Sequence, residues 1–416
     1  MITNKFKNTY SLRVLLISIS LLFSLGYSPL NAQEKQEKPK NKINVVWLPV
    51  IASTPANGWM FGVAPAANWL MGDKESTSIS STLASLIYTT KKQFLFTFKS
   101  TVFGHDDSFV IMQDWRYFIT SQPTFGLGTG PQSAKLVASG VEYQDGLFSK
   151  GTEDPQYMNF NFLRLHQTFL KRSGASRFFY GIGYHLDIHS KIDDKLLDLE
   201  SVPPLLTSHY SYSQKYGFNN EHYSLSGFSL NLLLDTRDNT INPYNGRYAF
   251  ATFRFNPTWI GSTKSSSTLW VEYRDYIHLS SERKRNLLAF WFYGNFQTSG
   301  ALPYLDLPAL GWDQFGRSGR AYPQGRFRGE NLLYSELEWR LPLSKKSDKL
   351  GAVIFLNATT ASNTDADIKL FSYVNLGYGL GLRYMVNEEA RTNLCLDFGF
   401  GDYGAKGFYL GVNEVF

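Results

Sequence analysis

Acidic and basic residues that recur at every second position are the side chains best placed to act on one another. Glu336, Glu338 and Arg340 alternate with apolar residues, and Asp235 and Arg237 have the same spacing. On a strand, this alternation puts the members of each set on one face. Carboxylates beside guanidinium groups form ion pairs. The ordinary alternative is that they are polar residues of a strand face without a special role.

Sequence signatures of catalysis are missing. The chain has no Gly-x-Ser-x-Gly, His-Glu-x-x-His or P-loop string, and the glycine-rich residues 126–130 precede no helical pattern. His185 and His189 would share a strand face, but no third ligand is evident nearby. The single cysteine, Cys395, allows no internal disulfide and no cysteine metal cluster. We therefore expect no enzymatic activity, no cofactor and no metal.

The composition indicates an ordered chain that does not bind nucleic acid. It has 416 residues, of which 43% are hydrophobic and 16% aromatic, which excludes intrinsic disorder. The formal net charge is +6, and three of these charges (Lys5, Lys7 and Arg13) precede Gln33. The rest of the chain is nearly neutral and has no long basic stripe, so nucleic-acid binding has little support.

Residues 1–32 resemble a secretory signal peptide. The three basic residues are followed by an apolar stretch at 14–27, which is short for a membrane helix, and Ala32 offers a cleavage site. Residues 33–43 are charged and read as a periplasmic linker. No later apolar run reaches the 18 or more residues of a membrane helix. We expect an exported chain that is periplasmic, secreted or an outer-membrane barrel.

Period-2 patterns dominate from Asn44 onward and favour the barrel. Between Tyr373 and Tyr384 the even positions are all apolar, and the odd positions are mostly Gly or polar. A soluble sandwich also alternates. Long strands, an aromatic apolar face and a glycine-rich polar face are typical of a membrane barrel, where a charge facing lipid at mid-bilayer costs about 2–4 kcal/mol. We expect the charges to face the lumen.

The patterns predict sixteen antiparallel strands, an all-β transmembrane barrel over residues 44–416. We place them at 44–54, 58–71, 77–88, 93–104, 107–120, 157–170, 176–191, 223–237, 246–257, 267–280, 285–298, 329–343, 349–360, 370–386, 391–403 and 406–416. Long loops at 121–156, 192–222 and 299–328 should share the extracellular end. A closed sheet has no unpaired edge, so 44–54 should pair with 406–416.

Three strings resemble motifs of the BamA/TamA superfamily of outer-membrane barrels, the bacterial surface-antigen family. The first, 234–239 with 242–246, is similar to the family's pattern of a strand end, a turn and a strand start, although an ordinary polar hairpin turn would have a similar sequence. Its residues are Asp235, Arg237, Asp238, Asn242, Pro243 and Gly246.

The second string, 319–328, resembles the family's sixth-loop motif, which has an Arg-Gly-Tyr or Arg-Gly-Phe tip. Its matching residues are Arg320, Tyr322, Gly325 and Arg326, and Ala321 replaces the glycine.

The third string, 338–342, resembles the family's twelfth strand, and Asn357 stands where the next strand usually offers an aspartate. The resemblance implies that the long loop before strand twelve folds into the lumen. It also implies that Arg320 pairs with acidic groups of the inner wall, chiefly Glu338, within the set Glu336, Glu338, Arg340 and Asn357. A terminal aromatic, Phe416, is typical of barrels recognised by assembly machinery.

The resemblance implies a barrel that assists protein insertion or translocation, or perturbs lipid, at the bacterial outer membrane. Outer-membrane lipids, assembly machinery during biogenesis and protein clients are the expected partners. Family members usually carry periplasmic POTRA domains, which 33–43 cannot hold. A passive pore or structural barrel is therefore the main alternative, and a lipid-modifying enzyme is a more distant one. The oligomeric state is open.

Overall fold

Sixteen strands form one antiparallel sheet in the computed structural model, each paired with its neighbours in chain order. The structure describes residues 43–54, 58–130, 142–144, 147–148, 155–388 and 391–416. The signal peptide and nearly all of the linker predicted above lie outside these residues. Residues 43–416 form one compact unit. The all-β barrel class predicted from the sequence is confirmed.

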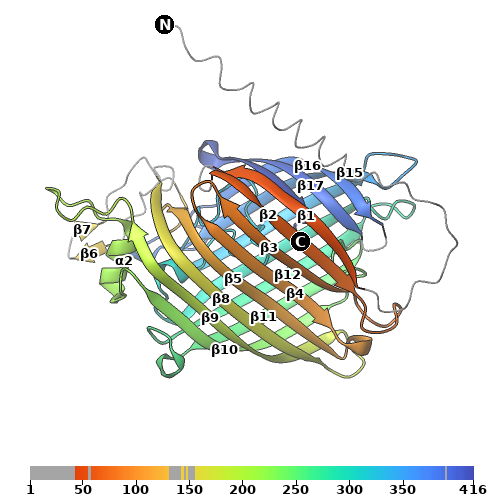
Figure 1. The fold of residues 1–416 in the computed structure, drawn as a ribbon, viewed down its shortest axis with the longest axis horizontal. Coiled ribbons are helices and arrows are strands. Elements are labelled where there is room, and N and C mark those ends of the chain that lie inside the picture. Colours follow the sequence, from red (N-terminus) through yellow and green to blue (C-terminus); the bar gives the residue numbers. More distant parts are fainter. Residues whose placement is uncertain (1–42, 55–57, 131–141, 145–146, 149–154, 389–390) are drawn as a thin grey trace, which may run out of the picture. The chain divides into compact units, whose positions relative to one another are not determined.

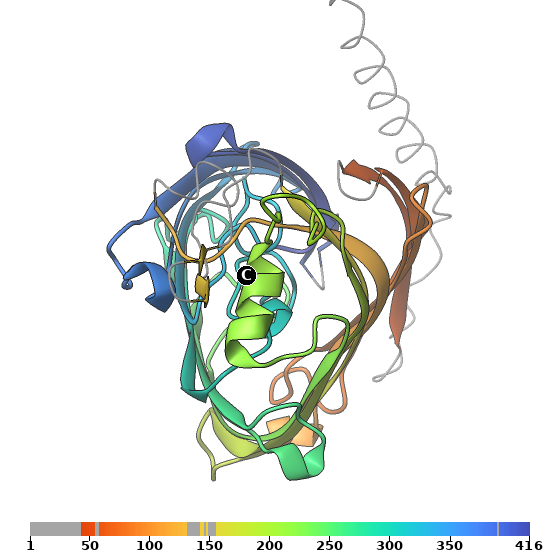
Figure 2. The ribbon, with the colours of Figure 1, turned by 90° about the vertical axis from the view of Figure 1, so that its left-hand side faces the viewer.

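The strands are long, and their bounds lie close to the predicted ones. They are β1 (Asn44–Thr54), β2 (Gly58–Trp69), β3 (Ser80–Thr89), β4 (Phe94–Phe103), β5 (Phe109–Thr124), β8 (Gln156–Arg172), β9 (Phe178–Asp194), β10 (Tyr223–Asp235), β11 (Gly246–Asn256), β12 (Ser266–His278), β13 (Leu287–Gly300), β14 (Asn331–Pro342), β15 (Leu350–Ala361), β16 (Asn375–Asn387), β17 (Thr392–Gly401) and β18 (Lys406–Val412). The tilted strands curl into a barrel (Figures 1 and 2). Two further short strands, β6 (Glu142–Gln144) and β7 (Leu147–Phe148), pair with each other in the loop after β5.

The barrel seam is open in the described residues, and the predicted pairing of 44–54 with 406–416 is wrong. The first strand, β1, pairs with β2 only, and β18 pairs with β17 only. Asn413 takes a left-handed backbone conformation with φ of 67°, and Glu414 accepts a hydrogen bond from Arg383 inside the lumen, so β18 ends at Val412 after seven residues. The last residues then turn away from the β1 edge, and Phe416 becomes buried.

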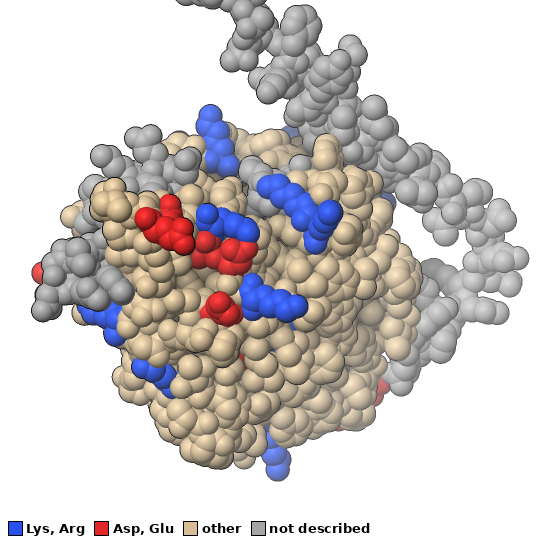
Figure 3. All heavy atoms as spheres, turned by 60° about the vertical axis from the view of Figure 1, so that its left-hand side comes forward, with Lys and Arg blue, Asp and Glu red and all other residues tan. Residues whose placement is uncertain are grey.

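The strands present their apolar residues outward and their polar residues inward. In β16, Leu376, Leu380 and Leu382 are exposed, whereas Arg383 is only 2% exposed. This is the inverse of a soluble sheet, whose apolar face is buried, and it fits a lipid-facing surface. In the view of Figure 3, the charged side chains gather over the loops at one end of the barrel, and most of the remaining visible surface is uncharged.

The two ends of the barrel differ. The loops 125–155, 195–222 and 301–330 all follow strands that run toward one end, and the opposite end carries shorter connections. Helix α2 (Ser208–Tyr216), which the sequence analysis did not predict, lies across the long-loop end (Figure 2). Its side chain Tyr212 is buried against Leu302 and Tyr304 of the 301–330 loop. No helix in the described part of the chain is long and apolar enough to cross a membrane.

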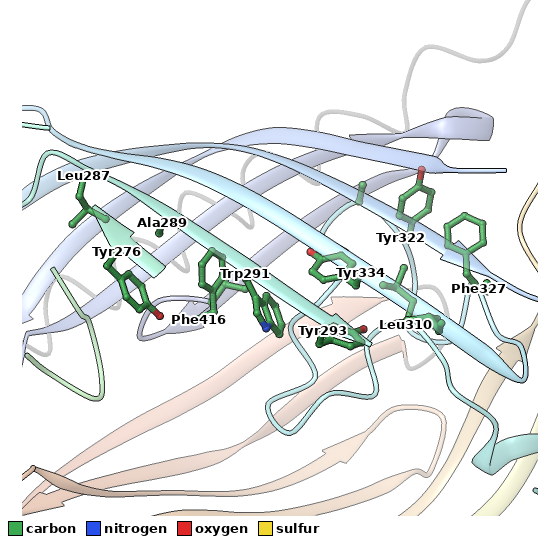
Figure 4. Packing of buried hydrophobic residues seen from close by; sticks show 14 of the residues in the cluster. Tyr276, Leu287, Ala289, Trp291, Tyr293, Leu310, Tyr322, Phe327, Tyr334 and Phe416 are labelled. Carbon is green, nitrogen blue, oxygen red and sulfur yellow. The ribbon is translucent and has the colours of Figure 1, made fainter. Parts of the chain in front are cut away.

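A cluster of aromatic side chains lies inside the barrel and joins the strand wall to loop 301–330 and the chain end. It includes Trp291, Tyr334, Tyr322 and Phe416 (Figure 4). The ring centroids of Trp291 and Phe416 lie 5.2 Å apart, and those of Trp291 and Tyr334 lie 5.3 Å apart. All members of the cluster come from residues 244–416, so it stiffens the second half of the barrel.

Candidate functional site

Loop 301–330 enters the barrel and returns on itself, which brings its tip to the inner wall. Leu310 donates a backbone hydrogen bond to Phe327, and Gly325 donates one to Leu310. Gly319 and Gly325, on either side of the tip, both have φ of 79°, in the left-handed region that glycine adopts without strain. The inward-folded long loop predicted from the sequence is therefore present.

Arg320 at the tip of this loop forms the centre of a buried ion-pair network. Its Nη1 donates to Asp397 at 3.0 Å, and its Nη2 donates to both Glu336 and Glu338. The guanidinium carbon also lies 3.8 Å from the ring centroid of Phe355. All three carboxylate residues are nearly inaccessible to solvent. Three acids thus hold one guanidinium group inside the barrel.

The alternation of β14 explains why two of these carboxylates share one face. Leu337 and Trp339 point outward, whereas Glu336, Glu338 and Arg340 are buried toward the lumen. The neighbouring guanidinium group of Arg340 donates from Nε to Glu338 at 2.7 Å. A buried carboxylate is costly unless its lone pairs are used. Here the oxygens of Glu338 are shared between two arginines.

Burial and charge act in opposite directions on Arg320. Burial alone would lower the pKa of the Arg320 guanidinium, but the adjacent carboxylates of Glu336 and Glu338 raise it well above its ordinary value. The arginine is therefore charged at every accessible pH. It therefore does not exchange protons as an acid or base, and its hydrogen bonds hold the loop against the wall.

Asp397 and its neighbours on β16 and β17 complete the network, and the sequence analysis did not assign them. Arg383 Nη1 donates to Asp397 at 2.6 Å, and Arg383 Nε donates to Glu414 at 2.7 Å. Asn393 donates to Glu414 at 2.6 Å. Their positions in the sequence could have indicated them, because Arg383 and Asp397 are charged residues on the glycine-rich faces of two alternating strands.

Asn357 does not replace an acidic partner of the Arg320 side chain. Its Nδ2 donates instead to the backbone carbonyl of Arg320 at 3.1 Å. It lies opposite Glu336 in the pairing of β14 with β15. The acidic position that the resemblance placed on this strand is filled from β17 by Asp397. Asn357 therefore positions the loop backbone, while Asp397 supplies the third carboxylate.

The remaining loop residues fix the tip against the last strands. Tyr322 accepts a hydrogen bond from the Asp402 backbone at 2.8 Å and donates to the Leu376 carbonyl. Arg326 is buried with its guanidinium 4.8 Å from the Phe125 ring centroid, and burial lowers its pKa to about 10. The left-handed backbone at Gly325 lets the chain turn between these two anchors.

Comparison with known proteins shows the family to which a chain with this network belongs. Residues 205–416, half of the chain and all of the network, match the Omp85 superfamily domain. The chain belongs to the Omp85 superfamily. No curated protein sequence matches it significantly.

One solved structure shares the fold of this Omp85 barrel, and a second resembles it more distantly, both at low sequence identity. BamA from Haemophilus ducreyi lacking POTRA domains 1–3 matches with a TM-score of 0.54 and 13% identity, over 91% of this chain and 70% of that one. CdiB from Acinetobacter baumannii matches with a TM-score of 0.49 and 11% identity, over 91% of this chain and 60% of that one. The chain thus spans less than two thirds of the length of that CdiB.

Ala321 occupies the tip position at which the resemblance expects glycine, and the loop still packs closely there. Ala321 is 1% exposed, and a Cβ atom added to Gly399 would lie 2.8 Å from the Ala321 nitrogen. Its φ of 122° is unfavourable for any residue with a side chain. The Omp85 barrel therefore keeps the close contact at the cost of local backbone strain.

The strand-turn string builds the turn between β10 and β11, away from the loop tip. The Asp235 carboxylate accepts two hydrogen bonds from Arg237, at 2.9 and 2.7 Å, and Asp238 accepts backbone hydrogen bonds from residues 244 and 245. Asn242 and Pro243 are buried in the turn. Gly246 has φ of 100°, and a side chain there would meet the Thr236 carbonyl at 2.2 Å. These contacts indicate a structural role.

Proposed function

We propose that this Omp85 barrel resides in the bacterial outer membrane and assists the insertion of proteins into that membrane, or their passage across it. The observation that carries the proposal is the open seam between β1 and β18. The proposed partners are unfolded client proteins, membrane lipids and the assembly machinery that inserts the barrel itself. The proposed activity is physical and needs no covalent step.

An open seam is costly in a bilayer unless something pairs with it. The backbone groups along the free edge of β1 have no water to bond inside the hydrocarbon region, where each unpaired group costs several kcal/mol. A client strand that adds to this edge would satisfy those groups and gain its own hydrogen bonds. The unpaired edge thus favours strand addition, which supports the insertion proposal.

The second half of the barrel should keep its structure while a client strand pairs with the β1 edge. Arg320 connects the loop to β14 and β17, and Asn357 adds β15 to the same network. The aromatic cluster inside the barrel takes none of its members from the described residues of β1 to β4. Movement during strand addition should therefore be confined to the first strands, because the later strands are held together from inside the barrel.

A passive pore is the alternative function, and the filled lumen argues against it. Loop 301–330 crosses the interior, and α2 lies across the long-loop end (Figure 2). A cavity of about 210 Å³ lies between the loop and the wall of β5 to β13. In planar bilayers the protein should show low conductance with rare openings. A steady, wide pore would favour the passive function.

The insertion proposal is tested with purified protein in liposomes. An unfolded outer-membrane barrel, kept soluble by a periplasmic chaperone, is added to vesicles with and without the protein. Folding of the client is followed by its altered gel mobility and by protease protection. The proposal predicts faster client folding in vesicles that contain the protein. Equal rates with several different clients would contradict it.

A further inference from the structure

A second, smaller cavity lies near the short-turn end of the barrel, beside the seam. Its volume is about 70 Å³, and it is lined by residues of β2 to β4, β12, loop 301–330, the turn after β10 and the chain end 413–416. Roughly 10–15 Å³ of such volume holds one water molecule, so the cavity has room for a small polyatomic group. The residues that define its charge are Lys99, Arg274, Arg317 and Glu414.

The charges that line this cavity do not balance. Three of the four charged side chains are cations, and the single acidic side chain is already engaged elsewhere. Glu414 accepts hydrogen bonds from Arg383 and Asn393, at 2.7 and 2.6 Å, and neither donor lines the cavity. The cavity therefore has an excess of positive charge near the lumen wall.

Lys99 is the strongest sign that a ligand belongs here. It is 8% exposed, and no described carboxylate lies within 4 Å of its Nζ. Asp114, directly opposite on β5, is occupied by two hydrogen bonds from Arg116, at 2.7 and 2.6 Å. The Lys99 nitrogen lies 5.7 Å from the Phe315 ring centroid, and Asp114 and Asp313 act on it only from beyond ion-pair distance. A buried cation without an anionic partner is unfavourable.

Arg317 is also left without a carboxylate partner. It donates from Nη1 to the backbone carbonyl of Glu414 and from Nη2 to that of Val412, the latter at 2.8 Å. Burial lowers the pKa of Arg317, as expected for a guanidinium group whose charge is poorly compensated. Arg274 differs, because Glu272 accepts two of its hydrogen bonds. Two cations in the cavity thus lack a matching anion.

Hydroxyl groups supply further donors around the same space. Ser81 of β3 and Thr101 of β4 are paired with each other, lie on the same lumen-facing side of these strands as Lys99, and line the cavity. Ammonium, guanidinium and hydroxyl donors that converge on a small space are the donors that bind a tetrahedral oxyanion. We propose that this cavity binds a phosphate group, either as free phosphate or as the head group of a membrane lipid.

The test uses the full chain folded in a non-ionic detergent and phosphate-free buffer. Inorganic phosphate is titrated by calorimetry, and thermal unfolding is followed in parallel for the wild type and for Lys99→Met. The matched control is Lys171→Met, since Lys171 is an exposed lysine on β8. Loss of a charge-assisted hydrogen bond should weaken phosphate binding by about tenfold or more. The control should bind like the wild type.

The variant should fold, because it removes a buried charge that has no partner. Without phosphate, Lys99→Met should unfold at the wild-type temperature or above it. Short-chain phosphatidic acid, compared with diacylglycerol of the same chain length, identifies the source. Lysine-dependent binding of phosphatidic acid that displaces phosphate indicates a lipid head group, and binding of phosphate alone indicates the free anion. No saturable binding of either, or equal affinity in Lys99→Met, would overturn the proposal.

Discussion

Arg320 donates a hydrogen bond to Asp397 at 3.0 Å, and this contact joins the tip of the lumen loop to the penultimate strand. The same guanidinium group reaches Glu336 and Glu338 on β14. One side chain therefore connects a loop to two strands that are separated in the sheet by β15 and β16. Contacts inside the lumen thus hold the second half of the barrel together, and its last strand, β18, borders the seam.

Replacing Arg320 should weaken the whole barrel. In Arg320→Met, three buried carboxylates lose their shared cation, and breaking a buried ion pair costs about 3–5 kcal/mol. Urea unfolding in detergent micelles, with gel mobility as a second readout, measures the change. Arg247→Met is the control, because the Arg247 side chain is 64% exposed in its pair with Asp275 and should contribute less than about 1 kcal/mol. Equal stability of wild type and Arg320→Met would refute the bracing role.

Ala321→Gly should stabilise the protein. Glycine accepts a φ of 122° without the steric cost that alanine pays, so relief of strain should raise the unfolding free energy by about 1 kcal/mol. Ala289→Gly is the matched control, since Ala289 is a buried strand residue and should lose about as much. Opposite signs for the two variants are the predicted result. A loss in both would show that the tip backbone is not strained.

Glu414 should make stability depend on pH at the acid end. Burial would raise the pKa of Glu414, but Arg383, Arg340 and Arg285 outweigh it and hold it at about 2. A lowered folded-state pKa contributes stability above the unfolded-state value near 4.5, and that contribution is lost as the pH falls toward 2. Glu414→Gln should therefore be less stable than wild type at pH 7.

The difference between Glu414→Gln and wild type should shrink as the pH is lowered from about 5 to 2, measured by chemical unfolding at each pH. Glu75→Gln, at an exposed acid, should follow the wild-type curve throughout. A difference that stays constant with pH would mean that the Glu414 carboxylate does not carry this contribution.

Phe416 should contribute to stability in addition to any role in assembly. It is 4% exposed and packs on Trp291, and its main-chain oxygen accepts a hydrogen bond from Arg340 at 2.9 Å. Phe416→Ala should cost about 3–5 kcal/mol in purified protein, where no assembly machinery is present. Phe408→Ala, at an exposed aromatic of β18, should cost much less. Unchanged stability of purified Phe416→Ala would leave only the assembly role.

Alternation predicted the strands well because the lipid-facing side must be apolar at every second residue. All sixteen strands are present, and most bounds agree within three residues. The largest differences lie where tertiary contacts decide the backbone. Residues 370–374 belong to a loop, and 413–416 leave the sheet because Glu414 is drawn to Arg383 inside the lumen.

The network was only partly accessible to sequence reasoning. The alternation on β14 put Glu336 and Glu338 on one face, and the family resemblance suggested Arg320 as their partner. Asp397 was missed because a charge on a lumen face does not reveal which loop will reach it from 77 residues earlier. Helix α2 was missed because its burial depends on contact with loop 301–330 and not on its own pattern.

Activity should require that the β1 edge at the open seam stays free to pair with a client strand, and a reversible lock between β1 and β18 tests this requirement. Single cysteines along β1 and along β18 are combined in a Cys395→Ser background, and the pair that forms a disulfide most completely is used in the liposome assay. We predict that the oxidised protein no longer accelerates client folding and that a reducing agent restores the acceleration. Undiminished activity of the fully cross-linked barrel would rule out strand addition at the seam.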